Sequence, residues 1–411
     1  GHSLIKECEI EIGGQRIDKH TSMWNRVYSD LTEFNPSGHF GAGVAPSDAG
    51  VEGNGTLYQL MTGNGYGINT NLNNAGGGAN EFGIKTNGNV INGFTYKDGA
   101  SGPIASIDIG TIFLPLNFWF CRNPGLALPL IALQYHEVKV KMTFEQLTNL
   151  VRLDDSDDFN NPVAHDATCE ETGKAFNLWC DYIYLDTDER RRFAQVSHEY
   201  LIEQLQYSEN TVSTASPSID LNFNHPVKEL VWCMRNVTAS DTDGGRHQPL
   251  TSALGDVTAS QVSLDEMGGN WQLKLNGHDR FKERDTRYFT KTQLWQHHTG
   301  YGGLPTKGDD DAEPELHSGD AATTVGADSI AVYSFALKPE EHQPSGTCNF
   351  SRIDNAQLVG SSLQVCASVS AVPGLANIGT TGATSINMTI FAVNYNVLRI
   401  MSGMGGLAYS N

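Results

Sequence analysis

The chain repeats a series of sequence elements, and this duplication limits the fold more than any other feature. The strings EIEIGGQRIDK (Glu9–Lys19) and QLKLNGHDRFK (Gln272–Lys282) each predict an alternating strand, a glycine turn and a basic stretch that can form a helix. Each stretch leads to a tryptophan, Trp24 or Trp295. A supersecondary unit that recurs in this way predicts two similar β domains.

Further elements follow in the same order in both halves of the chain. An apolar strand is predicted in TIFLPLNFWF (111–120) and in SIAVYSFALKP (329–339), and a turn with proline and glycine follows each. A strand with charges on one face comes next, in LQYHEVKVKM (133–142) and CNFSRIDNAQL (348–358). The identity between the halves is low, but the preserved order indicates a duplication.

Each half ends in another apolar strand, LWCDYIYLD (178–186) and IFAVNYNVLRI (390–400). We therefore predict a first β domain at residues 1–196, a connector at 197–210 and a second β domain at 211–411. The connector has weak helical character, since Ser197 can cap a helix and Leu201 and Leu205 would share one face. Below, residues 1–196 are called the first half and residues 211–411 the second half.

Two long polar stretches interrupt the strand pattern, Pro36–Pro103 and Gly300–Asp328. Both contain too few apolar residues to form a core of their own. Loops of this length in a compact domain are usually functional or disordered. We expect both to be large surface loops.

The string NFWFCRNPGLALPLIALQYHEVKV (117–140) is apolar enough to raise the question of a membrane span. A spanning helix needs about 20 largely apolar residues, but Arg122, Pro124 and Pro129 interrupt this string. We predict instead a buried strand at 113–120, a turn and a second segment that ends in a strand.

No complete catalytic or metal motif is present in the sequence. Two His-Glu pairs, at residues 136 and 198, begin like the zinc motif HExxH, but Val140 and Ile202 occupy the position of its second histidine. The acidic run at 154–158 could hold Ca²⁺, but its spacing does not match an EF-hand loop and such runs are more often solvated. The sequence predicts no enzyme, no catalytic residue and no cofactor.

The charge of the chain argues against nucleic acid as a direct partner. The net charge is −20, whereas binding to phosphates requires a basic face. The one basic triplet, Arg190–Arg192, directly follows Asp186, Asp188 and Glu189. We interpret this cluster as a satisfied ion-pair network.

The seven cysteines are scattered and include no CxxC pair. They therefore indicate neither a zinc site nor a disulfide framework. We expect mostly free, buried thiols in a reducing compartment.

Candidate N-glycosylation sequons occur at Asn54, Asn236, Asn349 and Asn387. Asn54 lies in loop-like sequence, whereas Asn236 follows a predicted strand and Asn387 opens one. The two strand-associated residues could equally be paired backbone positions.

Six strings spread over nearly the whole chain resemble the major capsid proteins of nucleocytoplasmic large DNA viruses, a group that includes chlorella viruses and iridoviruses. PGLALPLIALQYHEVK and NVLRIMSGMGGLAY are the most specific parts of the match. The strings lie at Glu9–His20, Phe118–Val140, Asp181–Gln206, Leu221–Trp232, Tyr333–Leu358 and Asn394–Asn411.

The resemblance implies an all-β fold of two tandem eight-stranded antiparallel jelly rolls with long surface loops and short helices. It implies a homotrimer with a pseudo-hexagonal outline that tiles the icosahedral capsid of a large double-stranded DNA virus. The outer loops of such proteins often carry glycans, and the base faces minor capsid proteins and an internal membrane. The expected location is the virion, after assembly in the host cytoplasm.

The chain departs from the family pattern at its start, where members carry a region with the first strands of the first jelly roll. We therefore expect the first jelly roll to be incomplete, with exposed strand edges.

Subunit contacts are expected at Asp186–Arg192, at the connector Ser197–Gln206 and at the glycine-bearing tail Met401–Asn411, which is too small and apolar for a free terminus. The candidate interface residues are Asp186, Glu189, Arg190, Arg191, Arg192, Met401, Met404, Leu407 and Tyr409.

An alternative function is a carbohydrate-binding module or glycosidase, which would need surface aromatics and a carboxylate pair beside a cleft. The apolar surroundings of the tryptophans favour core packing instead. They are Trp24, Trp119, Trp179, Trp232, Trp271 and Trp295.

Overall fold

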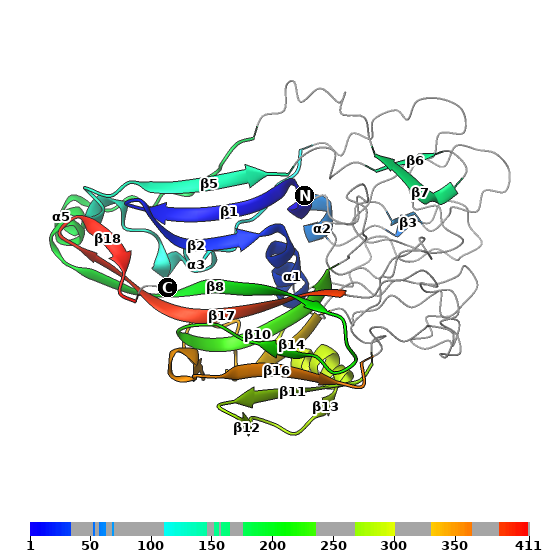
Figure 1. The fold of residues 1–411 in the computed structure, drawn as a ribbon. Helices are drawn as coiled ribbons and strands as arrows, with labels where there is room; N and C mark the ends of the chain where they lie inside the picture. The colour runs from blue at the N-terminus through cyan, green and yellow to red at the C-terminus, as the bar shows by residue number, and fades with distance from the viewer. Residues whose placement is uncertain are drawn as a thin grey trace.

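The computed structural model describes residues 1–33, 52–53, 57–62, 68–69, 111–145, 152–155, 158–164, 176–235, 268–300, 330–363 and 386–409. Within these residues the chain is built from antiparallel sheets with a few short helices (Figure 1). The predicted all-β class, built of jelly rolls, is confirmed.

A six-stranded sheet forms the centre of the molecule. Its neighbouring strands are β14 (Ile330–Ser334), β10 (Pro226–Arg235), β17 (Ile386–Met401) and β18 (Met404–Leu407). In addition, β15 (Cys348–Asn349) pairs with β10, and β8 (His198–Val212) pairs with β17 along its whole length.

A five-stranded sheet covers one face of this central sheet. It contains β12 (His278–Asp279), β11 (Asn270–Leu275), β16 (Ala356–Ser361) and β9 (Ser218–Asp220) in this order, with β13 (Arg284–Asp285) also paired to β11. The rings of Trp232 and Trp271 meet edge to face at 6.0 Å in the core between the two sheets. The sandwich therefore has a fully buried aromatic centre.

The first half contributes a three-stranded sheet, β2 (Gln15–Thr21), β1 (Ile5–Ile12) and β5 (Val138–Phe144). Its core contains Ile10 and Ile12 from β1 together with Leu398 and Ile400 from the far end of β17. Figure 1 shows β8 and β17 running below this sheet. The two long strands thus contribute to the cores of both halves.

The repeated hairpins have the same local geometry. Gly13 (φ 59°) and Gly14 (φ 85°) join β1 to β2, and Asn276 (φ 51°) and Gly277 (φ 78°) join β11 to β12. Two consecutive residues with positive φ are typical of the type I′ turn, which favours Asn and Gly. Helices follow both hairpins, as the repeat predicts: α1 (Ser22–Thr32) in the first half and η5 (Tyr288–Thr292) with α7 (Gln293–His297) in the second.

The remaining short elements lie mostly in the first half. The short helices are η1 (His2–Leu4), α2 (Leu57–Thr62), α3 (Trp119–Arg122), η2 (Pro124–Leu126), η3 (Leu130–Ala132), α5 (Thr187–Gln195) and η6 (Phe350–Arg352). Two small hairpins are formed by β3 (Glu52–Gly53) with β4 (Ile68–Asn69) and by β6 (Arg152–Asp155) with β7 (Asp158–Ala164). No helix of the described residues is long and apolar enough to cross a membrane.

The helical interpretation of the connector is wrong, because residues 198–212 form strand β8. Residues four apart lie on one face of a strand as well as of a helix, so Leu201 and Leu205 could not distinguish the two. The segment is a strand because it pairs with β17 along its length, from Val212 opposite Ile386 to His198 opposite Ile400. The helix instead precedes the connector, as α5.

Two predicted strands of the first half are also wrong within the described residues. Residues 111–117 form no strand, and α3 occupies 119–122 of the predicted strand 113–120. Residues 178–186 likewise form no strand, and their side chains are mostly exposed. By contrast, the strand predicted at the end of the second apolar segment is confirmed as β5.

Candidate functional site

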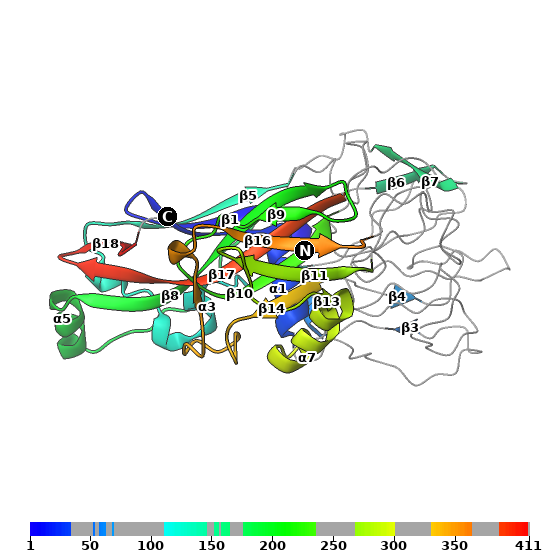
Figure 2. The ribbon, with the colours of Figure 1, turned by 60° about the horizontal axis from the view of Figure 1, so that its bottom comes forward.

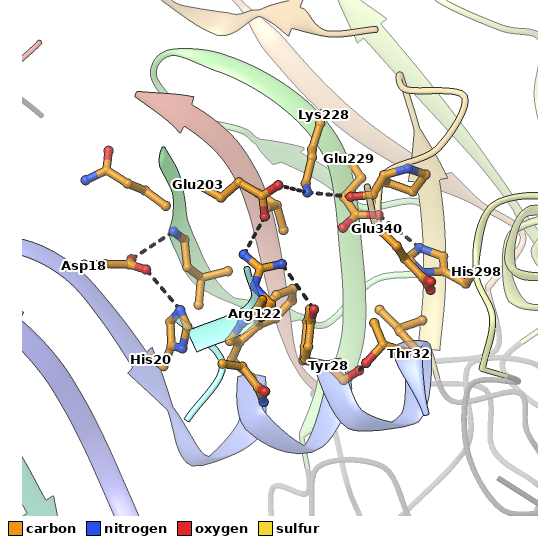
Figure 3. Close-up of a pocket in the computed structure, with 17 residues that line it drawn as sticks. Asp18, His20, Tyr28, Thr32, Arg122, Glu203, Lys228, Glu229, His298 and Glu340 are labelled. Carbon is orange, nitrogen blue, oxygen red and sulfur yellow. Dashed lines mark hydrogen bonds and ion pairs between the residues drawn. The ribbon is translucent and has the colours of Figure 1, made fainter. Parts of the chain in front are cut away.

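A buried charged junction connects the two halves (Figure 3). Its centre is Glu203 on β8, which is 4% exposed. One carboxylate oxygen of Glu203 accepts from Arg122 Nη2 (2.5 Å), and the other lies 2.7 Å from Lys228 Nζ. Arg122 also donates to the hydroxyl of Tyr28 on α1 (3.1 Å). Glu203 therefore joins α3 of the first half to β10 of the second.

His298 makes the second part of the junction. Its Nε2 lies 3.0 Å from Glu229 and its Nδ1 lies 3.0 Å from Glu340. Glu340 also accepts from the backbone N–H and the hydroxyl of Thr299, each at 2.9 Å. The Thr299 hydroxyl in turn lies 3.1 Å from the carbonyl oxygen of Thr32 at the end of α1.

The pKa values of His298 and Glu203 are shifted in the direction that favours their charged forms. Burial opposes the charge of His298, but the carboxylates of Glu229 and Glu340 outweigh burial and raise its pKa to about 9. Burial likewise acts to raise the pKa of Glu203, but Lys228 and Arg122 outweigh it and lower that pKa. His298 and Glu203 are therefore both charged at neutral pH.

The charges of the junction balance when His298 is protonated. Three cations then face three carboxylates: Arg122, Lys228 and His298 against Glu203, Glu229 and Glu340. Balance matters because a buried ion without a partner is strongly destabilising. The cluster is therefore suited to hold segments together.

The junction has no space for a substrate. Its cavity of about 20 Å³ is lined by these charged groups and by Trp24, Leu31 and Val393. Such a volume holds about one water molecule. Among the described residues, no group of three or more His, Cys, Asp or Glu side chains could hold a metal ion. The arrangement supports a structural role.

The C-terminal tail forms a second contact between the halves within one chain, and the subunit contact expected of it stays a prediction. The N–H of Tyr135 donates to Gly403 O (3.0 Å), and the N–H of Gly405 donates to His136 Nδ1 (3.1 Å). Gly403 has a φ of 79°, and a Cβ atom there would lie 2.5 Å from the Tyr135 ring. The two most specific strings of the family resemblance therefore pack against each other, with the glycines permitting the close approach.

Figures 1 and 2 show α5 and β18, which carry most of the predicted interface residues, at the same end of the molecule. Met401, Met404 and Tyr409 are about half exposed or more, whereas Leu407 packs against the core of the first half. Asp186, which directly precedes α5, and Glu189 and Arg190–Arg192 on α5 are all exposed. Within the described part of the chain no ion pair involves the three arginines, so the interpretation as a satisfied network is wrong.

The tryptophan and cysteine predictions are only partly confirmed. Trp24, Trp119, Trp232 and Trp271 are buried, but Trp179 and Trp295 are both 83% exposed. The five described cysteines are free. Cys8 and Cys233 are buried and Cys348 is half-buried, whereas Cys121 and Cys180 are exposed.

The glycosylation candidates remain predictions. Asn54 and Asn236 lie outside the described residues. Asn349 is exposed on β15, where its side chain accepts the N–H of Ser351 (3.1 Å). Asn387 lies inside β17, paired with Thr211 on one side and Arg235 on the other.

The charged residues Lys228 and Glu229 of the junction were missed by sequence reasoning, although a signal was present. Lys228 and Glu229 interrupt the string HPVKELVW, which is otherwise apolar after its histidine. Charged residues are almost never fully buried unless they are paired. Such an interruption of a central strand indicates a buried ion pair.

Comparison with known proteins identifies the family. The model of the large eukaryotic DNA virus major capsid protein matches residues 189–308 and 317–406, and a model of the major capsid protein N-terminus matches residues 99–186. This chain belongs to the family of large eukaryotic DNA virus major capsid proteins. Family members are structural and not enzymatic, so the chain is a capsid protein of the virion that assembles with other capsid proteins.

Individual capsid proteins agree with this assignment. The major capsid protein of Pyramimonas orientalis virus is 42% identical over 413 residues, which cover 100% of this chain and 78% of that protein. The major capsid protein of Paramecium bursaria Chlorella virus 1 is 36% identical, covering 99% of this chain and 79% of that protein. A chain from the quasi-atomic model of the PBCV-1 virus capsid matches with a TM-score of 0.62 and 33% identity, covering 100% of this chain and 84% of that chain.

Proposed function

We propose that three copies of this capsid protein form a homotrimer with a pseudo-hexagonal outline, which serves as the capsomer of an icosahedral shell. The observation that carries this proposal is the duplicated unit of a type I′ hairpin followed by a helix. Two similar halves per chain give six similar units in a trimer. Such a trimer can fill a hexagonal lattice with one kind of subunit, and closed cyclic symmetry is the usual arrangement of oligomers.

Within this proposal, the capsomer binds other capsomers at its sides and minor capsid proteins at its base. The internal membrane of the virion would be reached through those proteins. Assembly would take place in the host cytoplasm, and any glycans would be attached to the surface loops. The domain limits 1–196 and 211–411 are part of the same proposal.

The trimer is tested by the mass of the purified protein in solution. Light scattering should give three times the 44.7 kDa mass of one chain. Deleting Ser402–Asn411 should abolish the trimer, because it removes β18 and the exposed side chains of Met404 and Tyr409.

The tail deletion needs a control because β18 also stabilises its own chain. Replacing Tyr409 with Ser keeps β18 and should retain the subunit fold, as checked by circular dichroism. A monomeric mass for the intact protein would contradict the trimer, and an unchanged trimer after the deletion would exclude the tail from the interface.

A further inference from the structure

The loop at residues 335–347, which joins β14 to β15, is held by the charged junction. Lys228 Nζ donates to the carbonyl oxygen of Pro339 in this loop. The side chain of Glu340 enters the junction, where it lies 3.0 Å from His298 Nδ1. Several other side chains of the loop are exposed. A loop whose outer side meets solvent therefore depends on buried charges for its position.

His298 lies between two carboxylates that come from different elements (Figure 3). Its Nδ1 is 3.0 Å from Glu340 of the loop, and its Nε2 is 3.0 Å from Glu229 on β10. An ionised carboxylate only accepts hydrogen bonds, so each contact needs an N–H on the ring. The charged imidazolium has two N–H groups, whereas the neutral ring has one. Both contacts therefore exist together only while His298 is protonated.

The contact with Glu340 is the one that deprotonation should break. Glu229 is 5% exposed, whereas the side chain of Glu340 is 22% exposed and has the N–H and the hydroxyl of Thr299 as further donors. A carboxylate without a partner costs most where it is most buried, so the remaining N–H of His298 should stay with Glu229. Glu340 then faces a nitrogen lone pair and is repelled toward water.

The other titratable groups around this site are already paired. They are Arg122 and Lys228 with Glu203, Tyr28 with Arg122, Asp18 with His20, and Lys338 with Glu341. The two cations of the junction besides His298 both face Glu203, so neither replaces the charge of His298 beside Glu340. The protonation of one histidine thus decides whether the loop keeps its side-chain contact.

We propose that the loop 335–347 is proton-gated: it is closed while His298 is protonated, and it opens when His298 loses its proton, while the sheets stay folded. Thr299, the second partner of Glu340, also donates to the carbonyl oxygen of Thr32 on α1 (3.1 Å). Opening therefore weakens one of the contacts between the two halves. The gate lies within one chain and does not depend on the proposed trimer.

The direction and the pH range of the effect follow from linkage. With both carboxylates in place the pKa of His298 is raised from 6.5 to about 9, and it falls back toward 6.5 when Glu340 leaves. The closed loop is therefore fully favoured below pH 6.5 and loses this advantage as pH rises through 9. Because opening releases one proton, the opening constant rises by up to about tenfold per pH unit in this range.

Limited proteolysis of the whole protein measures the opening. Subtilisin has broad specificity and works at alkaline pH, and mass spectrometry of the fragments identifies cuts between residues 335 and 347. Dividing the cleavage rate by that of a free peptide of the same loop sequence removes the pH dependence of the protease. This ratio follows the open population when opening is fast relative to cleavage. It should rise about tenfold or more between pH 7 and 9, while the circular dichroism spectrum stays unchanged.

Three variants separate the gate from a general effect of pH. His298→Gln cannot carry a charge, so its loop should be cut at pH 7 about as fast as that of the unmodified protein at pH 9. Glu340→Gln keeps an oxygen for Thr299 but removes the charge that neutral His298 repels, so its ratio should change little with pH. Glu341→Gln alters the next carboxylate, which pairs with Lys338 at the surface, and should retain the full pH dependence.

Three results would overturn the proposal. The first is a cleavage ratio that does not change between pH 7 and 9 in the unmodified protein. The second is the same rise in His298→Gln or Glu340→Gln, because neither variant has the ion pair that deprotonation breaks. The third is a circular dichroism signal that is lost in step with cleavage, which would mean global unfolding and not a local opening.

Discussion

The strand β17 and the segment 178–186 are counterparts in the repeat, yet they differ in every structural respect. β17 pairs with β8 on one side and β10 on the other, and its residues Met388–Tyr395 are all buried. The segment 178–186 forms no strand within the described residues, and Tyr184 is 92% exposed. An apolar, alternating string becomes a strand where neighbouring backbones satisfy its N–H and C=O groups. The comparison teaches that such a string indicates the ability to form a strand, while the sheet decides whether it forms.

The largest expected difference between the two regions is in stability. Phe391→Ala removes a buried ring from the centre of β17 and should lower the free energy of unfolding by about 3–5 kcal/mol. Tyr184→Ala changes a side chain that is 92% exposed and should change the free energy by less than about 0.5 kcal/mol. Urea unfolding of the two variants at one protein concentration measures both. Equal losses would show that the segment 178–186 is packed in solution.

A smaller expected effect is the pH dependence of stability that comes from the charged junction beside β17. The neighbours of β17 carry the buried junction, and the pKa of His298 rises there from 6.5 to about 9. Because the folded pKa is above the unfolded one, the stabilisation is complete below pH 6.5 and is lost as pH rises through 9. At about 1.4 kcal/mol per pKa unit, the loss is on the order of 3 kcal/mol.

The control for this pH dependence is His298→Gln, which cannot gain a charge. Its free energy of unfolding should be lower at pH 6 and should fall much less between pH 6.5 and 9.5 than that of the unmodified protein. Chemical denaturation at several pH values measures both curves. Parallel curves would mean that His298 is not the titrating group.

Much of the fold follows from local sequence patterns. The hairpins at Glu9–Lys19 and Gln272–Lys282 were predictable because their glycine turns and alternating strands act over a few residues, and helices follow both, as the repeat predicts. The small, apolar composition of the tail indicated that it packs against another surface, and we expected a subunit contact there. The intrachain partners Tyr135 and His136 could not be predicted, because composition says nothing of which surface a segment meets.

The errors arise where long-range contacts decide. Leu201 and Leu205 fit one face of a helix or of a strand, and pairing with the distant β17 selects the strand. Trp24 and Trp295 both follow a repeated hairpin, yet one is buried and the other exposed, because on α7 the preceding residue, Leu294, enters the buried cluster that Trp24 enters from α1. The charged junction combines residues more than 200 positions apart, such as Tyr28 and Glu340, and no local pattern contains that information.

The central claim is that the duplicated halves build a three-chain capsomer, and electron microscopy of the purified protein tests it most directly. Particle averages should show trimers with a hexagonal outline, in which the two halves of each chain alternate around the ring. Monomers, or oligomers without the hexagonal outline, would contradict the account.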